Sequence, residues 1–270
     1  MMKGWMLTSV VAAALCGPVA GEFTVVIDPG HGGQRIPGKS DGSLGGDGSS
    51  HNKAISALER RLEKDMTLDF SLAAARALRE SPRAKKIGGV DVVLTREDDR
   101  HVAAMMRAAI ATQNSADVFL SIHFNSFNGR TEGTRAYYCA EDHPRWEYMH
   151  FTNPYLKRDK AFSLGVAREV AAALKPLGGS GQAGAHGDDS LLKDGNRVLG
   201  FARLDTHMRN AAVSLLEVEF IDNPKVEAWL LRDYEKSQKV VGEAIAKAVC
   251  DYLEEKDKWD VRRPAKAPGR

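Results

Sequence analysis

Short apolar runs rich in β-branched residues alternate along this chain with longer segments whose apolar residues recur at helical spacing. Runs of the first kind predict buried strands, and segments of the second kind predict amphipathic helices. Their alternation is typical of an α/β fold, in which helices cover both faces of a mostly parallel sheet. We therefore expect a single domain built on a twisted, mostly parallel sheet flanked by helices. The expected strands cover residues 23–27, 90–94, 118–122, 134–138 (at an edge of the sheet) and 213–218, and the expected helices cover 58–80, 102–114, 162–174 and 225–253.

The first residues of the chain have the features of a secretory signal. Lys3 supplies a positive charge, an apolar stretch follows over residues 5–15, and small residues lead to Gly21. The apolar stretch is short for a membrane span. An uncleaved anchor is the alternative, whereas lipidation of Cys16 is disfavoured by its large neighbour Leu15.

These features predict three parts of the chain: a signal peptide over 1–21, a folded domain over 22–254 and a basic, flexible tail over 255–270. We therefore expect export to the periplasm or cell envelope, with no stable membrane span after processing. Of the 270 residues 43% are hydrophobic, which is enough for a sizeable core, and we expect a monomer. The net charge of +2 gives no reason to expect a nucleic-acid partner.

Two cysteines, Cys139 and Cys250, would be left after removal of a signal peptide. An exported protein could pair them, although a buried free thiol explains Cys250 equally well. Neither has the spacing of a zinc or redox motif.

Polar residues that bind metals or transfer protons follow three of the expected strands. His31 lies between glycines after the first strand, His123 follows the third strand, and Glu217 lies near the end of the last. In an α/β sheet the ends of neighbouring strands meet where functional sites assemble. Glu63, at the start of the first long helix, is the expected third metal ligand, with Glu59 as its competitor. Two histidines and one carboxylate with an open fourth position are typical of hydrolytic zinc sites.

Glu217 calls for a different explanation from the ligands. A carboxylate inside an apolar strand is costly unless it has a partner or a function. Beside a metal site it would act as a general base and then as a general acid. The alternative is a buried ion pair with Arg107 or Arg96.

Five sequence segments occur in a recognisable order: DPGHGG, LEKD, LTREDD, NSADVFLSIHFNS and LLEVEFIDNP. Together they resemble the zinc-dependent N-acetylmuramoyl-L-alanine amidases of the bacterial cell wall, over residues 23–253. The resemblance implies one Zn²⁺ ion bound by His31, Glu63 and His123, with Glu217 as the catalytic glutamate. It further implies peptidoglycan as the substrate, with cleavage of the amide between N-acetylmuramic acid and L-alanine.

The chain departs from the family pattern in three places. Glu219 stands where the family usually has glycine. Strand alternation would put Glu219 on the same face as Glu217. Glu219 is therefore also a candidate for the base, although Glu217 is preferred. The Gly- and Ser-rich segment 34–56 is longer than expected and contains His51, an alternative ligand. Residues 139–160 and 178–200 are candidates for covering loops, but neither has the pattern of an amphipathic plug, so we expect no strong autoinhibition.

Supporting or substrate-binding roles are expected for Asp28, Asn125, Arg107 and His186. Asp28 would orient His31 or cap its turn, and His186 lies in a Gly-rich segment. The competing functions are another exported zinc hydrolase of peptidoglycan (a peptidase or deacetylase) and an inactive wall-binding relative. An activator protein and the preference for a particular stem peptide are open at this point.

Overall fold

The computed structural model describes residues 21–33, 54–140, 153–188, 197–204 and 206–259. Its centre is a six-stranded sheet with the order β2-β1-β3-β6-β4-β5. All neighbouring strands are parallel except β4 and β6, which are antiparallel. The strands are β1 (Phe23–Pro29), β2 (Val90–Leu94), β3 (Val118–Asn125), β4 (Thr134–Tyr138), β5 (Ala183–Gly187) and β6 (Ala212–Phe220).

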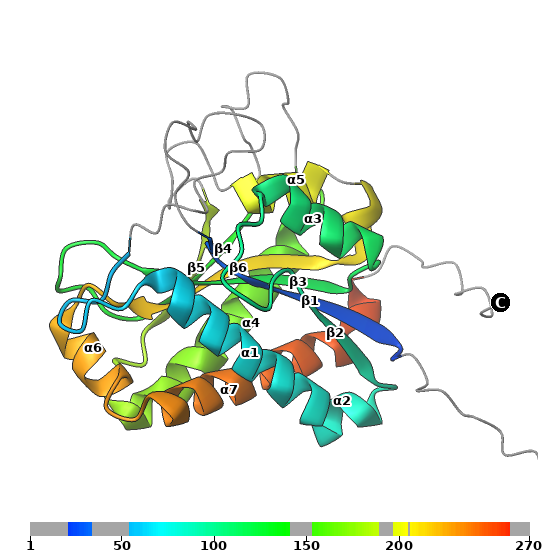
Figure 1. Ribbon diagram of the computed structural model, residues 1–270. Helices are drawn as coiled ribbons and strands as arrows, with labels where there is room; N and C mark the ends of the chain where they lie inside the picture. The colour runs from blue at the N-terminus through cyan, green and yellow to red at the C-terminus, as the bar shows by residue number, and fades with distance from the viewer. Residues whose placement is uncertain (1–20, 34–53, 141–152, 189–196, 205, 260–270) are drawn as a thin grey trace, which may run out of the picture.

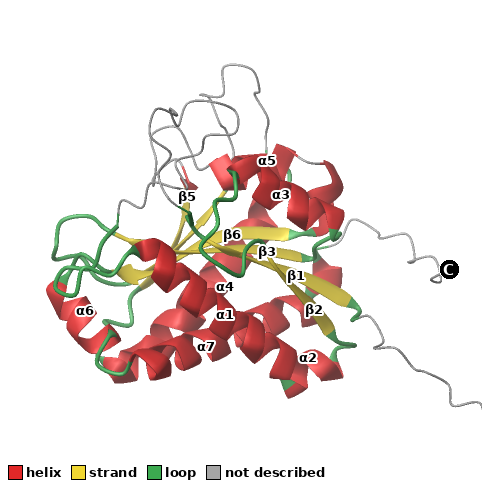
Figure 2. Cartoon of the chain, viewed as in Figure 1, coloured by secondary structure: helices red, strands yellow, loops and turns green. Residues whose placement is uncertain are grey.

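Helices cover both faces of this sheet (Figures 1 and 2). One face carries α1 (Glu63–Glu80), α4 (Leu156–Leu174), α6 (Pro224–Leu230) and α7 (Tyr234–Glu254), and the opposite face carries α3 (Ala104–Gln113) and α5 (Arg197–Leu204). The short α2 (Pro82–Lys86) follows α1. Among the described helices, none is both long enough and apolar enough to span a bilayer.

Alternating side chains of the central strands divide the core into two layers. Ile27 and Leu120 pack in the larger layer, under α1, α4 and α7. Val26 and Phe119 point the other way and pack in the smaller layer, against α3 and α5. Burial on both faces explains why these strands have continuous apolar sequences rather than alternating ones.

The α/β class, the mostly parallel sheet and five strands are confirmed, but several boundaries differ from the sequence analysis. Helix α1 begins at Glu63 rather than at residue 58, because Ile55 and Leu62 form a β-bridge that the helix cannot include. The expectation of a single C-terminal helix is wrong. The structure has α6 and α7, and Asp233 begins the second by accepting a hydrogen bond from the backbone N–H of Lys236.

The expectation of an edge position for strand 134–138 is also wrong. This strand, β4, lies between β6 and β5, and β5 occupies the edge. Strand β5 was not expected, because Ala183–Gly187 reads AGAHG, which lacks the β-branched residues typical of strands.

The segment expected as a flexible tail begins with folded residues. Lys256 is buried and pairs with Asp117 at the start of β3, and Trp259 packs against the larger core layer. The fold therefore extends about five residues beyond the expected boundary, since an ion pair with a buried aspartate holds this end of the chain. Residues 1–20 of the expected signal peptide, His51 and residues 260–270 lie outside the described residues.

Candidate functional site

Three of the predicted site residues come together at the carboxyl ends of β1 and β3. His31 follows β1, His123 lies in β3, and Glu63 is the first residue of α1. Oε1 of Glu63 lies 3.0 Å from Nε2 of His31 and 3.0 Å from Nδ1 of His123. The same oxygen accepts a hydrogen bond from the backbone N–H of Phe124 at 3.1 Å. One carboxylate oxygen is therefore the common neighbour of both imidazoles.

The backbone conformation of the loop after β1 lets these side chains approach one another. His31 has a φ of 57°, in the left-handed region that most non-glycine residues avoid. Gly30 precedes it, and a Cβ on Gly30 would lie 2.4 Å from the His123 ring. Glycine at this position therefore lets the ring of His123 approach the loop, and the rings of His31 and His123 lie edge to face with centroids 4.8 Å apart.

Two buried arginines hold the same loop by hydrogen bonds to its backbone carbonyl oxygens. Arg107 of α3 donates hydrogen bonds to the carbonyl oxygens of Pro29 and His31 and pairs with Asp28 at 2.6 Å. Arg96 donates to the carbonyl oxygens of Pro29 and Gly30, and also to that of Lys64 in α1. Arg96 thus ties the His31 loop to the helix that carries Glu63.

Asp28 acts through this clamp and not through a direct contact with His31. Its carboxylate is fully buried and accepts hydrogen bonds from Ser121, Thr95 and Arg107. Burial would raise the pKa of Asp28, but the charge of Arg107 and these hydrogen bonds lower it below its ordinary value. Asp28 is therefore ionised and fixes Arg107, which in turn holds the backbone of His31. The simpler expectation, in which Asp28 orients the His31 ring, is wrong.

The environment shifts the pKa of Glu63 and that of His123. Burial opposes ionisation of Glu63, yet the imidazoles, His31 foremost, lower the pKa of Glu63 well below its ordinary value. Burial lowers the pKa of His123 and so favours its neutral form. A neutral imidazole has a free lone pair and an ionised carboxylate has several, which is the protonation state that metal binding requires.

Glu217 lies in β6 directly opposite His123 of β3. Its carboxylate is buried, and Oε2 has no hydrogen-bond partner among the described residues. Burial and the negative charge of Glu63 raise the pKa of Glu217 well above its ordinary value. The alternative of an ion pair with Arg107 or Arg96 is wrong, because those guanidinium groups bind Asp28 and backbone carbonyls instead.

Glu219 does not face this site. The pairing of β3 with β6 shifts between His123 and Asn125, so that three residues of β6 span the distance of two in β3. Such a bulge breaks the alternation that would have placed Glu219 beside Glu217. Oε2 of Glu219 instead accepts hydrogen bonds from the backbone N–H groups of Gly133 at 2.8 Å and Phe220 at 3.1 Å.

The donor set fits a zinc ion. Ligand atoms of His31, Glu63 and His123 all lie within 4.8 Å of one another. Nδ1 of His31 is buried and has no partner in the described part of the chain. Two imidazoles and one carboxylate are ligands that zinc prefers, whereas calcium and magnesium prefer sites made of oxygen atoms alone.

Other candidates of the sequence analysis are placed as follows. Glu59 is exposed and pairs with Arg61, so it is not a ligand in this arrangement. Asn125 ends β3, and its side chain accepts a hydrogen bond from the backbone N–H of Ser126 and contacts the hydroxyl of Tyr137. His186 is exposed on β5, with its ring centroid 6.0 Å from that of Tyr137.

Two residues beside the site were missed: Arg135 and Tyr137 of β4. Arg135 is the cross-strand neighbour of Glu217, and Tyr137 lies two residues further along the same strand. A strand over residues 134–138 was expected from the sequence, but the position of this strand next to β6 was not.

A model of the N-acetylmuramoyl-L-alanine amidase family matches residues 25–251. The chain belongs to this family. The match covers β2 to β6 in full and most of β1, and it includes all four residues of the candidate site.

Individual relatives agree with this membership. YqiI, an uncharacterised protein of Bacillus subtilis, is 33% identical over 138 residues, which are 51% of this chain and 54% of that protein. The N-acetylmuramoyl-L-alanine amidase AmiC of Escherichia coli O6:H1 is 30% identical over 126 residues, 44% of this chain and 25% of AmiC. The chain thus matches about half or less of the length of these two relatives.

Among solved structures, the catalytic domain of CwlV is similar over nearly its whole length. CwlV is an N-acetylmuramoyl-L-alanine amidase from Bacillus (Paenibacillus) polymyxa var. colistinus. The comparison has a TM-score of 0.59 and 26% sequence identity, and covers 86% of this chain and 98% of the CwlV domain.

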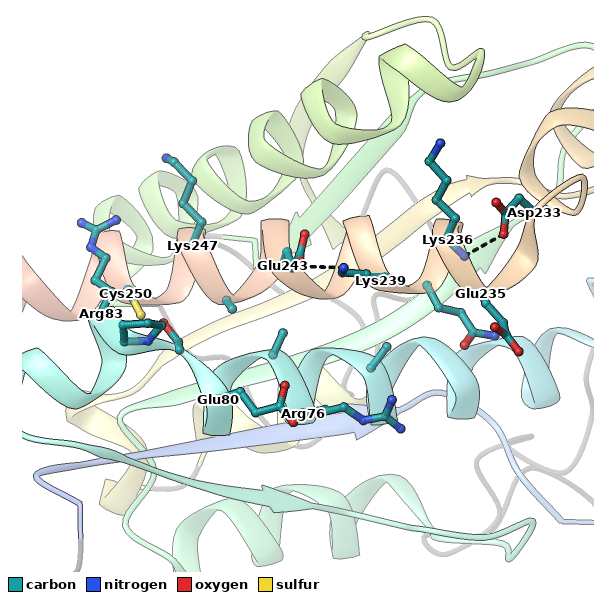
Figure 3. A pocket seen from close by; sticks show the side chains of 16 residues that line it. Arg76, Glu80, Arg83, Asp233, Glu235, Lys236, Lys239, Glu243, Lys247 and Cys250 are labelled. Carbon is teal, nitrogen blue, oxygen red and sulfur yellow. Dashed lines mark hydrogen bonds and ion pairs between the residues drawn. The ribbon is translucent and has the colours of Figure 1, made fainter.

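A separate hollow of about 1000 Å³ lies between α1 and α7 (Figure 3). Charged side chains of both signs surround it, and some neutralise one another, as Lys239 and Glu243 do at 3.9 Å. None of the residues that line it belongs to the cluster around Glu63. We assign the candidate site to the carboxyl ends of β1, β3 and β6 and not to this hollow.

Proposed function

We propose that this chain hydrolyses the amide bond between N-acetylmuramic acid and L-alanine in bacterial peptidoglycan. The observation that carries the proposal is the cluster of His31, Glu63 and His123 within 4.8 Å, with the buried Glu217 on the neighbouring strand. Family membership and the likeness to the CwlV domain support the choice of substrate.

In this proposal His31, Glu63 and His123 hold one zinc ion. A bound zinc ion supplies Lewis acidity, which polarises a carbonyl group and acidifies water. Glu217 then has the task of moving the proton. Its Oε2 has no hydrogen-bond partner among the described residues. In this proposal Oε2 takes a proton from the attacking water and delivers it to the departing alanine nitrogen. Arg96, Arg107 and Asp28 keep the His31 loop in place during these steps.

We further propose that the protein is exported to the periplasm or cell envelope, where peptidoglycan lies, and acts there as a monomer. The signal-like sequence of residues 1–21 supports this location. Detection of the chain outside the cytoplasm, with a new N-terminus near residue 22, is the expected result of a fractionation experiment.

The activity is tested by incubating the purified mature chain with muropeptides, with and without a zinc chelator, and identifying the products by mass spectrometry. New L-alanine amino termini together with peptide-free muramic acid, both lost on chelation, are expected. Cleavage at another bond would instead identify a peptidase or deacetylase. No cleavage by the zinc-loaded protein would refute activity of the isolated chain and direct the search to an activator.

The role of Glu217 is tested by Glu217→Gln, which keeps the shape of the side chain but cannot accept a proton. We expect kcat to fall about 100-fold or more, in line with the usual contribution of general acid–base catalysis, while zinc is still bound. Glu80→Gln, at an exposed position of α1, is the matched control and should keep full activity. A Glu217→Gln variant that retains wild-type kcat would rule out this assignment.

A further inference from the structure

A row of neighbouring residues crosses the sheet next to the candidate site. His123 of β3 lies opposite Glu217 of β6, and Glu217 lies opposite Arg135 of β4. Paired residues on adjacent strands direct their side chains to the same face of a sheet, and adjacent strands are about 4.8 Å apart. Arg135 therefore stands on the same face as His123, one strand beyond Glu217.

The guanidinium group of Arg135 is held in a defined position. Its central carbon lies 4.9 Å from the centroid of the Phe220 ring, a cation–π arrangement. The hydroxyl of Tyr137 lies near the side chains of Arg135 and Asn125. A guanidinium that is positioned by an aromatic face and a hydroxyl loses little freedom when it binds a ligand.

This cation has no carboxylate partner in the described part of the chain. The buried arginines Arg96, Arg107 and Arg203 bind backbone carbonyls, aspartates or both within the protein. Arg135 is only half-buried, and no ion pair joins it to a described residue. Its central carbon lies over the ring of Phe220, and a guanidinium group is suited to bind a planar anion.

The next strand places a glycine and a histidine beside Arg135. Gly184 of β5 is the register partner of Arg135, and it has no side chain. The ring of His186 covers Gly184 so closely that a Cβ there would lie 2.6 Å from Nε2 of His186. His186 is exposed, so the row that begins at His123 ends at a polar, accessible side chain on the sheet edge.

We propose that Arg135 is a substrate-binding residue that holds a carboxylate of the stem peptide. The inference rests on the proposed function. The glycan strand consists of N-acetylated sugars without charge, whereas the stem peptide has carboxylates, so a cation beside Glu217 places the peptide on this side of the scissile amide. The nearest such group is the α-carboxylate of the second stem residue. This residue follows the alanine whose amino group is freed by hydrolysis.

The test compares two muropeptides that differ only at this carboxylate, one with the free acid and one with its amide. Wild-type protein should have the higher kcat/KM for the acid, by about 10-fold or more, because a charge-assisted hydrogen bond is lost in the amide. Arg135→Gln should abolish this preference, so that its kcat/KM is the same for the acid and for the amide. Arg135→Lys should restore part of the preference, since it keeps the charge but not the planar fork.

Arg168→Gln, which removes an exposed arginine of α4, is the control for a general effect of charge and should keep the wild-type preference. Thermal unfolding of each variant separates loss of folding from loss of recognition. Equal kcat/KM for acid and amide in the wild type, or an unchanged preference in Arg135→Gln, would overturn the inference.

A second measurement keeps this inference separate from the proposed reaction. Binding of the free stem peptide, as acid and as amide, is measured by calorimetry for the wild type and Arg135→Gln. If neither muropeptide is cleaved, the proposed reaction fails, and the Kd ratio alone then decides the role of Arg135. A ratio near one in the wild type refutes that role, and a ratio of about 10 that Arg135→Gln abolishes supports it.

Discussion

Glu219 offers the sharpest test of how this fold treats a buried charge. Glu219 is 2% exposed, and its carboxylate accepts hydrogen bonds from the backbone N–H groups of Gly133 and Phe220. Burial raises the pKa of Glu219 to about 7, although the two hydrogen bonds act in the opposite direction. Near neutral pH the folded protein therefore holds a proton that the unfolded chain releases.

The sign and size of the effect on stability follow from this difference. The unfolded chain loses the proton near its ordinary pKa of 4.5, and the folded protein loses it near about 7. Between these values the folded state binds more protons, so the free energy of unfolding decreases as the pH rises and levels off above about 7. A pKa difference of about 2.5 units at about 1.4 kcal/mol each amounts to a penalty of about 3 kcal/mol at alkaline pH.

Glu219→Gln should remove this penalty. The glutamine carbonyl oxygen can take the place of Oε2 and accept both backbone hydrogen bonds, while the side chain stays neutral at every pH. We expect the variant and the wild type to be equally stable below about pH 4.5, and the variant to be more stable by about 3 kcal/mol above about pH 8.

Urea denaturation followed by circular dichroism, at pH values across this window, measures the difference. Other groups also titrate, but they do so equally in both proteins and drop out of the comparison. Glu80→Gln at an exposed helical position should show no such pH dependence. A stability difference between Glu219→Gln and the wild type that stays constant with pH would refute the reasoning, because Glu219 would then titrate normally.

Three further predictions concern stability. Asp28→Ala leaves Arg107 buried without its counter-ion and should lower the free energy of unfolding by about 3–5 kcal/mol in urea. Phe70→Ala removes a fully buried ring from the larger core layer and should cost about 3–5 kcal/mol in the same assay, with Phe70→Leu milder. Cys139 and Cys250 are free and buried, so a reducing agent should leave the thermal midpoint unchanged, and a fall in the midpoint would show that they pair.

The site residues at the strand ends could be predicted because each lies in or directly after a short sequence pattern that indicates a buried strand. Apolar β-branched residues indicate buried strands, and His31, His123 and Glu217 follow or end such runs. Since parallel strands place their carboxyl ends at one end of the sheet, the α/β class predicts these residues at that end. Glu63 was predicted less directly, since its role depends on where α1 begins.

Features that depend on pairing between distant segments were not predictable. The bulge in β6 is a property of the β3–β6 register, so strict alternation gave the wrong side for Glu219. The position of Arg135 depends on β4 joining the sheet beside β6 in the opposite direction, which its own sequence does not determine.

The two acidic residues of the site differ because of their neighbours, not because of their burial. Glu63 and Glu217 are both buried, yet the pKa of Glu63 is lowered and that of Glu217 is raised. Glu63 has two imidazoles and a backbone N–H within hydrogen-bond distance of one oxygen, while Oε2 of Glu217 has no such partner among the described residues. Opposite shifts in a pair of nearby carboxylates assign opposite tasks. Glu63 stays ionised and suits a ligand, and Glu217 takes up a proton readily and suits the acid–base step, so exchanging the two roles would require moving the histidines.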